Sequence, residues 1–102
     1  MSYWMNDVMG ASIDEPNETQ IREIVSSLQT LADDEHPDVS LEHESGWGLS
    51  IYVDGTLLWE NVEDSSIPPR EITLDSWDEV IEVLLKLSRG DIDAVNQLDW
   101  QE

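Results

Sequence analysis

The chain has 102 residues, enough for one domain with a modest hydrophobic core. Its formal net charge of −20 comes from 24 acidic and only 4 basic residues, and Lys86 is the only lysine. Nucleic acids and anionic membranes are bound through cations that neutralise phosphates, so this charge excludes both as direct ligands and favours a basic partner. Self-repulsion on this scale also predicts a monomer when the protein is free.

The sequence contains no cysteine, which excludes disulfides, thiol catalysis and cysteine-based metal sites. Its first seven residues hold neither a basic region nor an apolar run, so no signal peptide is predicted. No apolar stretch approaches the length of a transmembrane helix. We therefore expect a cytoplasmic protein.

The first third of the chain predicts a strand followed by a helix. Residues 2–9 mix aromatic residues and Met with polar ones, as an edge strand does, and residues 10–16 are expected to form a linker. Asn17 is a candidate N-cap, and apolar residues then recur at helical spacing, which predicts a helix over 18–32. These apolar residues are Ile21, Ile24, Val25, Leu28 and Leu31.

Residues 38–44 alternate between apolar and polar side chains and predict a strand. The next strand can be reached through a two-residue or a three-residue loop. A three-residue loop over 44–46, with Gly46 in the left-handed conformation, pairs Leu41 with Leu49 and Val39 with Ile51. This register places the apolar residues of both strands on one face, so burial favours it.

Asp54-Gly55 separates two further apolar runs and is typical of a type I′ turn with a two-residue loop. That loop predicts a hairpin in which Ile51 pairs with Leu58 and Ser50 pairs with Trp59. The predicted core face carries Trp47, Leu49, Ile51, Val53, Leu58 and Val62. The predicted outer face carries Ser50, Tyr52, Leu57, Trp59 and Asn61.

The C-terminal third predicts a short strand over 70–74 and a second helix that begins with a capping box, Ser76 to Glu79. Its apolar stripe starts at Trp77 and continues until Gly90 ends the helix. Residues 91–95 predict a further helical turn, and Trp100 is expected to fold the tail back onto the body. The predicted order is β-α-β-β-β-(β)-α: an α+β domain with four to five antiparallel strands and two main helices on one face.

No pattern in the sequence predicts catalysis or a metal site. Residues 91–102 place acids at four calcium-loop positions, but Asn96 stands where such a loop has glycine. His36 and His43 lack the spacing of a metal-binding pair, and no serine lies in a nucleophile motif. We expect a protein that is not an enzyme and needs no cofactor.

The predicted outer face has the composition of a protein-binding surface, because aromatic residues supply contact area and surrounding acids attract a basic partner. The alternative is that a helix, the N-terminal segment or a second subunit covers this face and makes it ordinary core. The candidate partner-binding residues are Glu42, Tyr52, Asp54, Leu57, Trp59, Glu63 and Asp64.

The strand and turn from Leu49 to Gly55, and the ending in which Arg89-Gly90 precedes Trp100, resemble the Imm-type immunity proteins of bacterial polymorphic toxin systems. These systems deliver toxins by contact-dependent or type VI secretion. The resemblance implies tight binding to a cognate toxin domain, such as a nuclease or deaminase, whose active site is blocked. It implies no catalytic residue.

Three other interpretations remain open from the sequence. A DNA-mimic regulator would present regularly spaced carboxylates, and a secretion chaperone or adaptor would dimerise and bind a segment of its client. The acidity is also typical of halophilic adaptation, which would say nothing about partners.

Overall fold

The computed structural model describes residues 2–31, 38–64 and 66–101. The predicted end of the first helix at residue 32 and His36 lie outside these residues. The described part contains six strands and three helices. In chain order they are β1 (Tyr3–Asn6), β2 (Ser12–Asp14), α1 (Glu18–Leu31), β3 (Asp38–His43), β4 (Trp47–Tyr52), β5 (Thr56–Asn61), β6 (Arg70–Thr73), α2 (Trp77–Ser88) and α3 (Ile92–Asn96).

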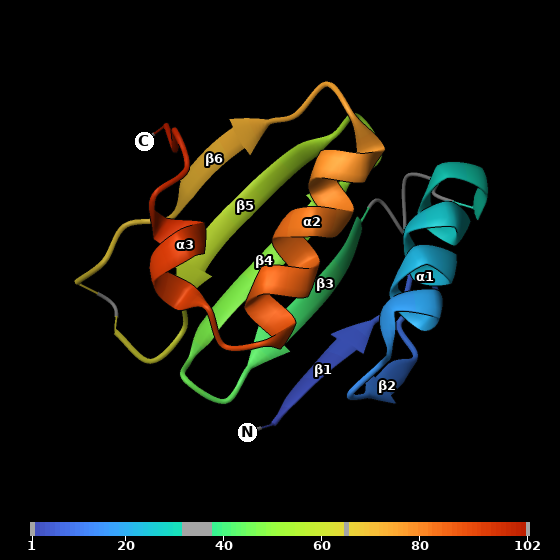
Figure 1. Cartoon of the computed structure of the whole chain (residues 1–102), viewed down its shortest axis with the longest axis horizontal. Coiled ribbons are helices and arrows are strands. Elements are labelled where there is room, and N and C mark those ends of the chain that lie inside the picture. The colour runs from blue at the N-terminus through green and yellow to red at the C-terminus, as the bar shows by residue number, and fades with distance from the viewer. Residues whose placement is uncertain (1, 32–37, 65, 102) are drawn as a thin grey trace.

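The six strands form one antiparallel sheet in the order β2-β1-β3-β4-β5-β6. All three helices lie on the same side of this sheet, as Figure 1 shows, with α2 crossing the central strands and α3 lying over β5. The predicted α+β class is therefore confirmed. Each strand in the middle of the sheet turns one row of side chains toward the helices and the other row away from them.

The sheet has one strand more than predicted, because residues 12–14 are not a linker. The carboxylate of Asp7 accepts hydrogen bonds from the backbone N–H groups of Met9 and Ala11, at 3.0 and 2.9 Å. Together with Gly10, whose φ is +86°, these bonds close a tight turn that folds β2 back against β1. The prediction that the first strand is an edge strand was therefore wrong.

The helix boundaries follow local capping chemistry. Asn17 caps α1 as predicted: its Oδ1 accepts from the Gln20 N–H, and Gln20 Oε1 accepts from the Asn17 N–H, both at 2.9 Å. Gly90, at φ +77°, ends α2 as predicted. The capping box predicted at Ser76 is absent, because the Ser76 side chain makes no cap hydrogen bond. The acids in the first turn still favour this end through the helix dipole.

The hairpin of β3 and β4 has the predicted register, with Leu41 opposite Leu49 and Val39 opposite Ile51. Gly46 is left-handed at φ +92°, and its N–H donates to the His43 carbonyl at 3.0 Å. The three-residue loop over 44–46 is confirmed.

The hairpin of β4 and β5 does not have the predicted register. Leu49 lies opposite Trp59 and Ile51 lies opposite Leu57, one residue away from the prediction. Gly55 alone is left-handed, at φ +90°, and its N–H donates to the Tyr52 carbonyl at 3.0 Å. The loop is thus a second three-residue turn over 53–55, in which the Asp54 carboxylate accepts from the Thr56 N–H at 2.9 Å.

This one-residue shift exchanges the two faces of β5. Leu57 and Trp59 were predicted to point outward, but both side chains are fully buried under the helices. Leu58 was predicted to be core, but it lies on the side of the sheet that the helices leave open. Val53 and Val62 are also not core, since their side chains are 49% and 68% exposed.

Trp59 is at the centre of the core beneath α3. Its ring stacks on Trp47 at a centroid distance of 4.5 Å and on Trp100 at 5.9 Å. Its Nε1–H donates to Asn96 Oδ1 at 2.8 Å. The tail therefore folds back as predicted, and Gln101 also pairs with Glu71 at the edge of the sheet.

Candidate functional site

No other element of the described chain covers the side of the sheet opposite the helices (Figure 1). Outward-pointing side chains on it are all partly or fully exposed. We call this surface the open face. It comprises Trp4, Asn6, Ser12, Asp14, Asp38, Ser40, Glu42, Ser50, Tyr52, Thr56, Leu58, Glu60, Glu71 and Thr73.

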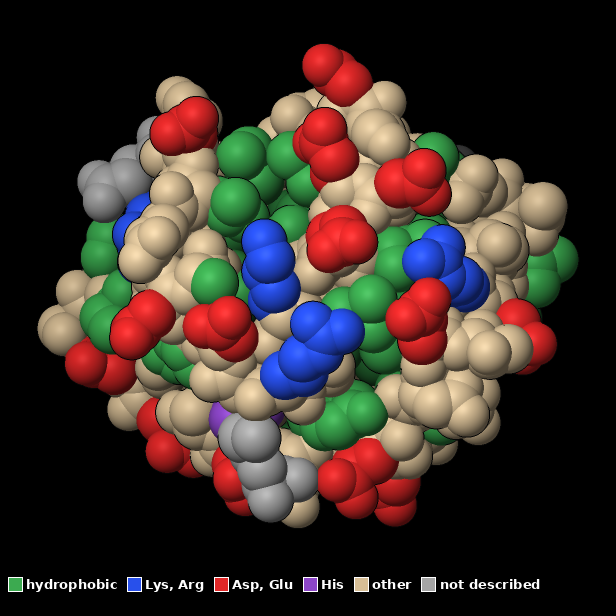
Figure 2. Space-filling model, in the orientation of Figure 1, with side chains coloured by type: hydrophobic (Ala, Val, Ile, Leu, Met, Phe, Trp, Pro, Cys, Tyr) green, Lys and Arg blue, Asp and Glu red, His purple; other side chains and the backbone are tan. Residues whose placement is uncertain are grey.

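The open face carries five acidic residues and none of the four basic residues of the chain. Three of the cations belong to α1 and to the end of α2, on the helical side. The fourth, Arg70, is in β6 but points toward the helices, where its Nη2 donates to Asn96 Oδ1 at 3.5 Å. Figure 2 looks onto the helical side and shows its basic side chains among the acidic ones. The basic residues are Arg22, Arg70, Lys86 and Arg89.

Two carboxylates share one row of the open face across a glycine. Glu42 and Glu60 flank Gly48, which has no side chain to separate them. The Glu42 carboxylate lies directly over Gly48, in the space that a Cβ there would occupy. Burial raises the pKa of Glu42, and the charge of Glu60 raises it further. A cation placed over this row would favour the ionised form of Glu42.

Two aromatic side chains stand among these acids. Trp4 is 36% exposed and lies opposite Glu42 in the neighbouring strand. The pKa of Tyr52 is raised by partial burial and then by the charges of Asp38, Glu60 and Glu71, so its phenol remains a hydrogen-bond donor at neutral pH. Partial burial also raises the pKa of Asp38.

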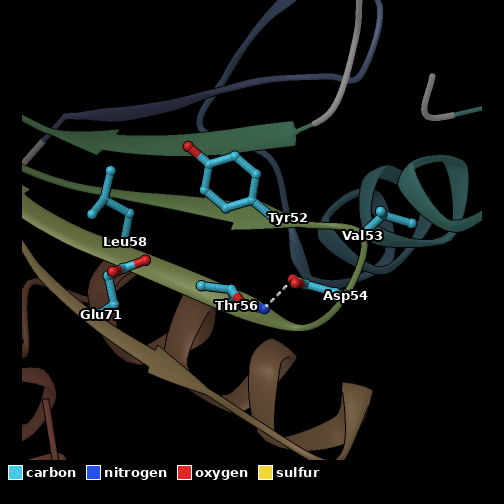
Figure 3. Close-up of a pocket in the computed structure, with 6 residues that line it drawn as sticks. All are labelled: Tyr52, Val53, Asp54, Thr56, Leu58 and Glu71. Carbon is cyan, nitrogen blue, oxygen red and sulfur yellow. Dashed lines mark hydrogen bonds between the residues drawn. The ribbon is translucent and has the colours of Figure 1, made fainter. Parts of the chain in front are cut away.

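A hollow of about 410 Å³ opens at one end of the open face, and six residues line it. Figure 3 shows Tyr52, Leu58 and Glu71 pointing to the same side of three successive strands, with the 53–55 turn closing the end. Thr56 lies opposite both Tyr52 and Thr73, so short side chains leave room between longer ones. The lining residues are Tyr52, Val53, Asp54, Thr56, Leu58 and Glu71.

The structure separates the predicted partner-binding residues into three groups. Glu42 and Tyr52 lie on the open face, and Asp54 lies at its end, where the Thr56 backbone N–H lowers the pKa of its carboxyl group. Leu57 and Trp59 are buried and cannot touch a partner.

Glu63 and Asp64 follow the opposite end of β5 from Asp54, in an exposed loop. There Asp64 closes a turn by accepting from the Ser66 hydroxyl and N–H, and these bonds lower its pKa. These two acids are thus remote from the hollow.

The open-face residues that were missed in the sequence include Trp4, Leu58, Glu60 and Glu71. Three of them depend on the register of β5, because a three-residue loop over 53–55 is required to turn Leu58 and Glu60 outward and to align Glu71 beside them. The Asp54-Gly55 dipeptide is compatible with both loop lengths, so it gave no local signal for this register.

No family model, curated protein or solved structure matches this chain. Among residues 2–31, 38–64 and 66–101, no group of three or more acidic or histidine side chains is placed to hold a metal ion. No helix in the same part of the chain is long and apolar enough to cross a membrane. The open face is therefore the feature from which we infer a function.

Proposed function

We propose that this protein is an immunity protein (antitoxin) that binds a basic, cytosol-acting toxin domain through the open face of its sheet and blocks it. The observation that carries this proposal is the exclusion of basic side chains from an aromatic and acidic sheet face. Within residues 2–31, 38–64 and 66–101, no element covers one face of the sheet, which holds aromatic and acidic side chains, while all four basic side chains lie elsewhere.

The composition of the open face suits a protein partner. Trp and Tyr give large contact areas for little loss of side-chain entropy, and such residues dominate binding energies at interfaces. Trp4, Tyr52 and Leu58 supply this apolar contact, and none of them is fully buried. The acids around them would speed association with a basic surface and would repel acidic proteins.

The same composition disfavours a DNA mimic. A mimic needs carboxylates at the regular spacing of phosphates and has no use for aromatic side chains between them. On the open face the acids are interrupted by Trp4, Tyr52 and Leu58. A nuclease or deaminase domain, whose basic cleft has to be closed by a shaped surface, fits this arrangement better.

The experiment that tests the proposal has two steps. Tagged protein is first used to capture partners from its source organism at moderate salt, and a basic protein retained in a 1:1 ratio is then purified. We expect the purified partner to be toxic when expressed alone, to lose its activity when this protein is added, and to associate more slowly as salt is raised. A partner whose activity is unchanged by saturating amounts of this protein would contradict an immunity function.

A further inference from the structure

We infer that the hollow at the end of the open face is an anchor site for one arginine side chain of the partner. The inference rests on the proposed function for the origin of that arginine. The hollow itself is a feature of the free protein, so its chemistry can be tested without any partner.

The walls of the hollow match the long stem of a basic side chain. Tyr52, Val53 and Leu58 form an apolar rim around Thr56, and Val53 is 49% exposed although it is aliphatic. Arginine and lysine bury their methylene groups along such surfaces while they keep the charged end at polar groups. An uncharged apolar side chain would leave the two carboxylates of the lining without a counter-ion.

The two acidic residues that line the hollow differ in whether their carboxylates are free to pair with a cation. Asp54 already accepts the Thr56 N–H at 2.9 Å, which fixes its carboxylate within the turn. Glu71 is exposed and projects beside Leu58, as Figure 3 shows. Glu71 is therefore the group that is placed to pair with an incoming cation, and Asp54 adds a fixed negative charge at the other end.

The aromatic wall favours arginine over lysine. A guanidinium group is planar, so it can stack on the Tyr52 ring while its N–H fork engages the Glu71 carboxylate. The negative charges of Asp38, Glu60 and Glu71 act on the Tyr52 phenol from the same face. No basic side chain of this protein lies on the open face to compete for this position.

The test is a titration of the isotope-labelled full chain with L-argininamide, followed by amide NMR shifts. L-Citrullinamide is the matched ligand control, because it keeps the α-amino group and the shape of the side chain but carries a neutral urea in place of the guanidinium. We expect saturable shifts centred on residues 52–58 and on Glu71, with a dissociation constant on the order of millimolar, as is usual for a ligand this small. Citrullinamide should give no saturable shift.

Three variants locate the site. Glu71→Gln should weaken argininamide binding about threefold, which is within the range of one solvent-exposed ion pair. Thr56→Ile keeps a β-branched residue in the strand and fills the hollow, so it should abolish saturation. Glu82→Gln removes an exposed carboxylate from α2 on the helical side and should leave the titration unchanged.

Shifts that spread over the whole acidic surface, or that respond equally to Glu71→Gln and Glu82→Gln, would overturn the inference and would mean that the cation is attracted only by net charge. The outcome of the argininamide titration does not depend on the proposed function. If argininamide binds but the captured partner is not a toxin, the proposed function is refuted and the anchor site is not. If the partner is a toxin but argininamide does not bind, the anchor site is refuted and the function is not.

Discussion

Replacing Trp59 with alanine tests whether this residue belongs to the core, as in the structure, or to a binding surface, as predicted from the sequence. The Trp59 side chain is fully buried, stacks on two other indoles and donates to Asn96. Truncation of a buried Trp costs about 3–5 kcal/mol of the free energy of unfolding. For a domain of this size, 1 kcal/mol corresponds to about 4–8 °C in Tm, so we expect a loss of at least about 12 °C.

The assay is thermal and urea unfolding, both followed by far-UV circular dichroism, which does not depend on tryptophan emission. Trp4→Ala is the matched control, because it removes the same side chain from the open face, where Trp4 is 36% exposed. We expect Trp4→Ala to cost about 1 kcal/mol or less. Trp59→Phe keeps a ring in the core and should give an intermediate loss if the alanine variant does not fold. Equal, small losses for Trp59→Ala and Trp4→Ala would refute the placement of Trp59 in the core.

Three further changes test other parts of the structure by the same unfolding measurement. Gly55→Ala should lose about 2 kcal/mol, because φ is +90° and the new Cβ would lie 2.7 Å from the Leu74 carbonyl oxygen; an unperturbed variant would argue against the three-residue loop. Asn96→Ala should lose about 1–3 kcal/mol by leaving the Trp59 Nε1–H unpaired, whereas Gln97→Ala, next to it and exposed, should lose little. Glu42→Gln should be slightly more stable than the wild type near pH 7, since burial and Glu60 raise the folded-state pKa of Glu42 above its unfolded value. Between those two pKa values the folded wild type binds more protons than the unfolded chain, so its stability falls as the pH rises through that interval. The stability difference between Glu42→Gln and the wild type should therefore shrink as the pH is lowered. A stability difference that does not change with pH would contradict the raised pKa of Glu42.

Most of the fold could be predicted from local patterns. The helices appear where apolar residues recur at helical spacing, and Asn17 and Gly90 mark two of their ends by capping chemistry that depends only on neighbouring residues. The β3–β4 register was also predictable, because only one loop length buries Val39 and Leu41 together with Leu49 and Ile51.

The β4–β5 register was not decided by the same reasoning, because both loop lengths at Asp54-Gly55 leave an apolar residue on each face. The register of this hairpin is set by Trp59, because only the three-residue loop places its ring in the core, where it stacks between Trp47 and Trp100. Trp100 is 41 residues further along the chain, so this contact leaves no local signal. The candidate site was therefore only partly predicted: Glu42, Tyr52 and Asp54 stay at the surface, while Leu57 and Trp59 do not.

The most direct test of the central claim is the affinity of the captured partner for two charge-insertion variants. Leu58→Arg places a cation in the middle of the open face, and Leu31→Arg places the same group at the end of α1, where Leu31 is 54% exposed. We expect Leu58→Arg to raise the dissociation constant by at least about tenfold, because a buried like charge costs more than 1.4 kcal/mol at an interface, and Leu31→Arg to change it little. Equal affinities for the two variants, or a greater loss for Leu31→Arg, would show that the partner does not dock on the open face.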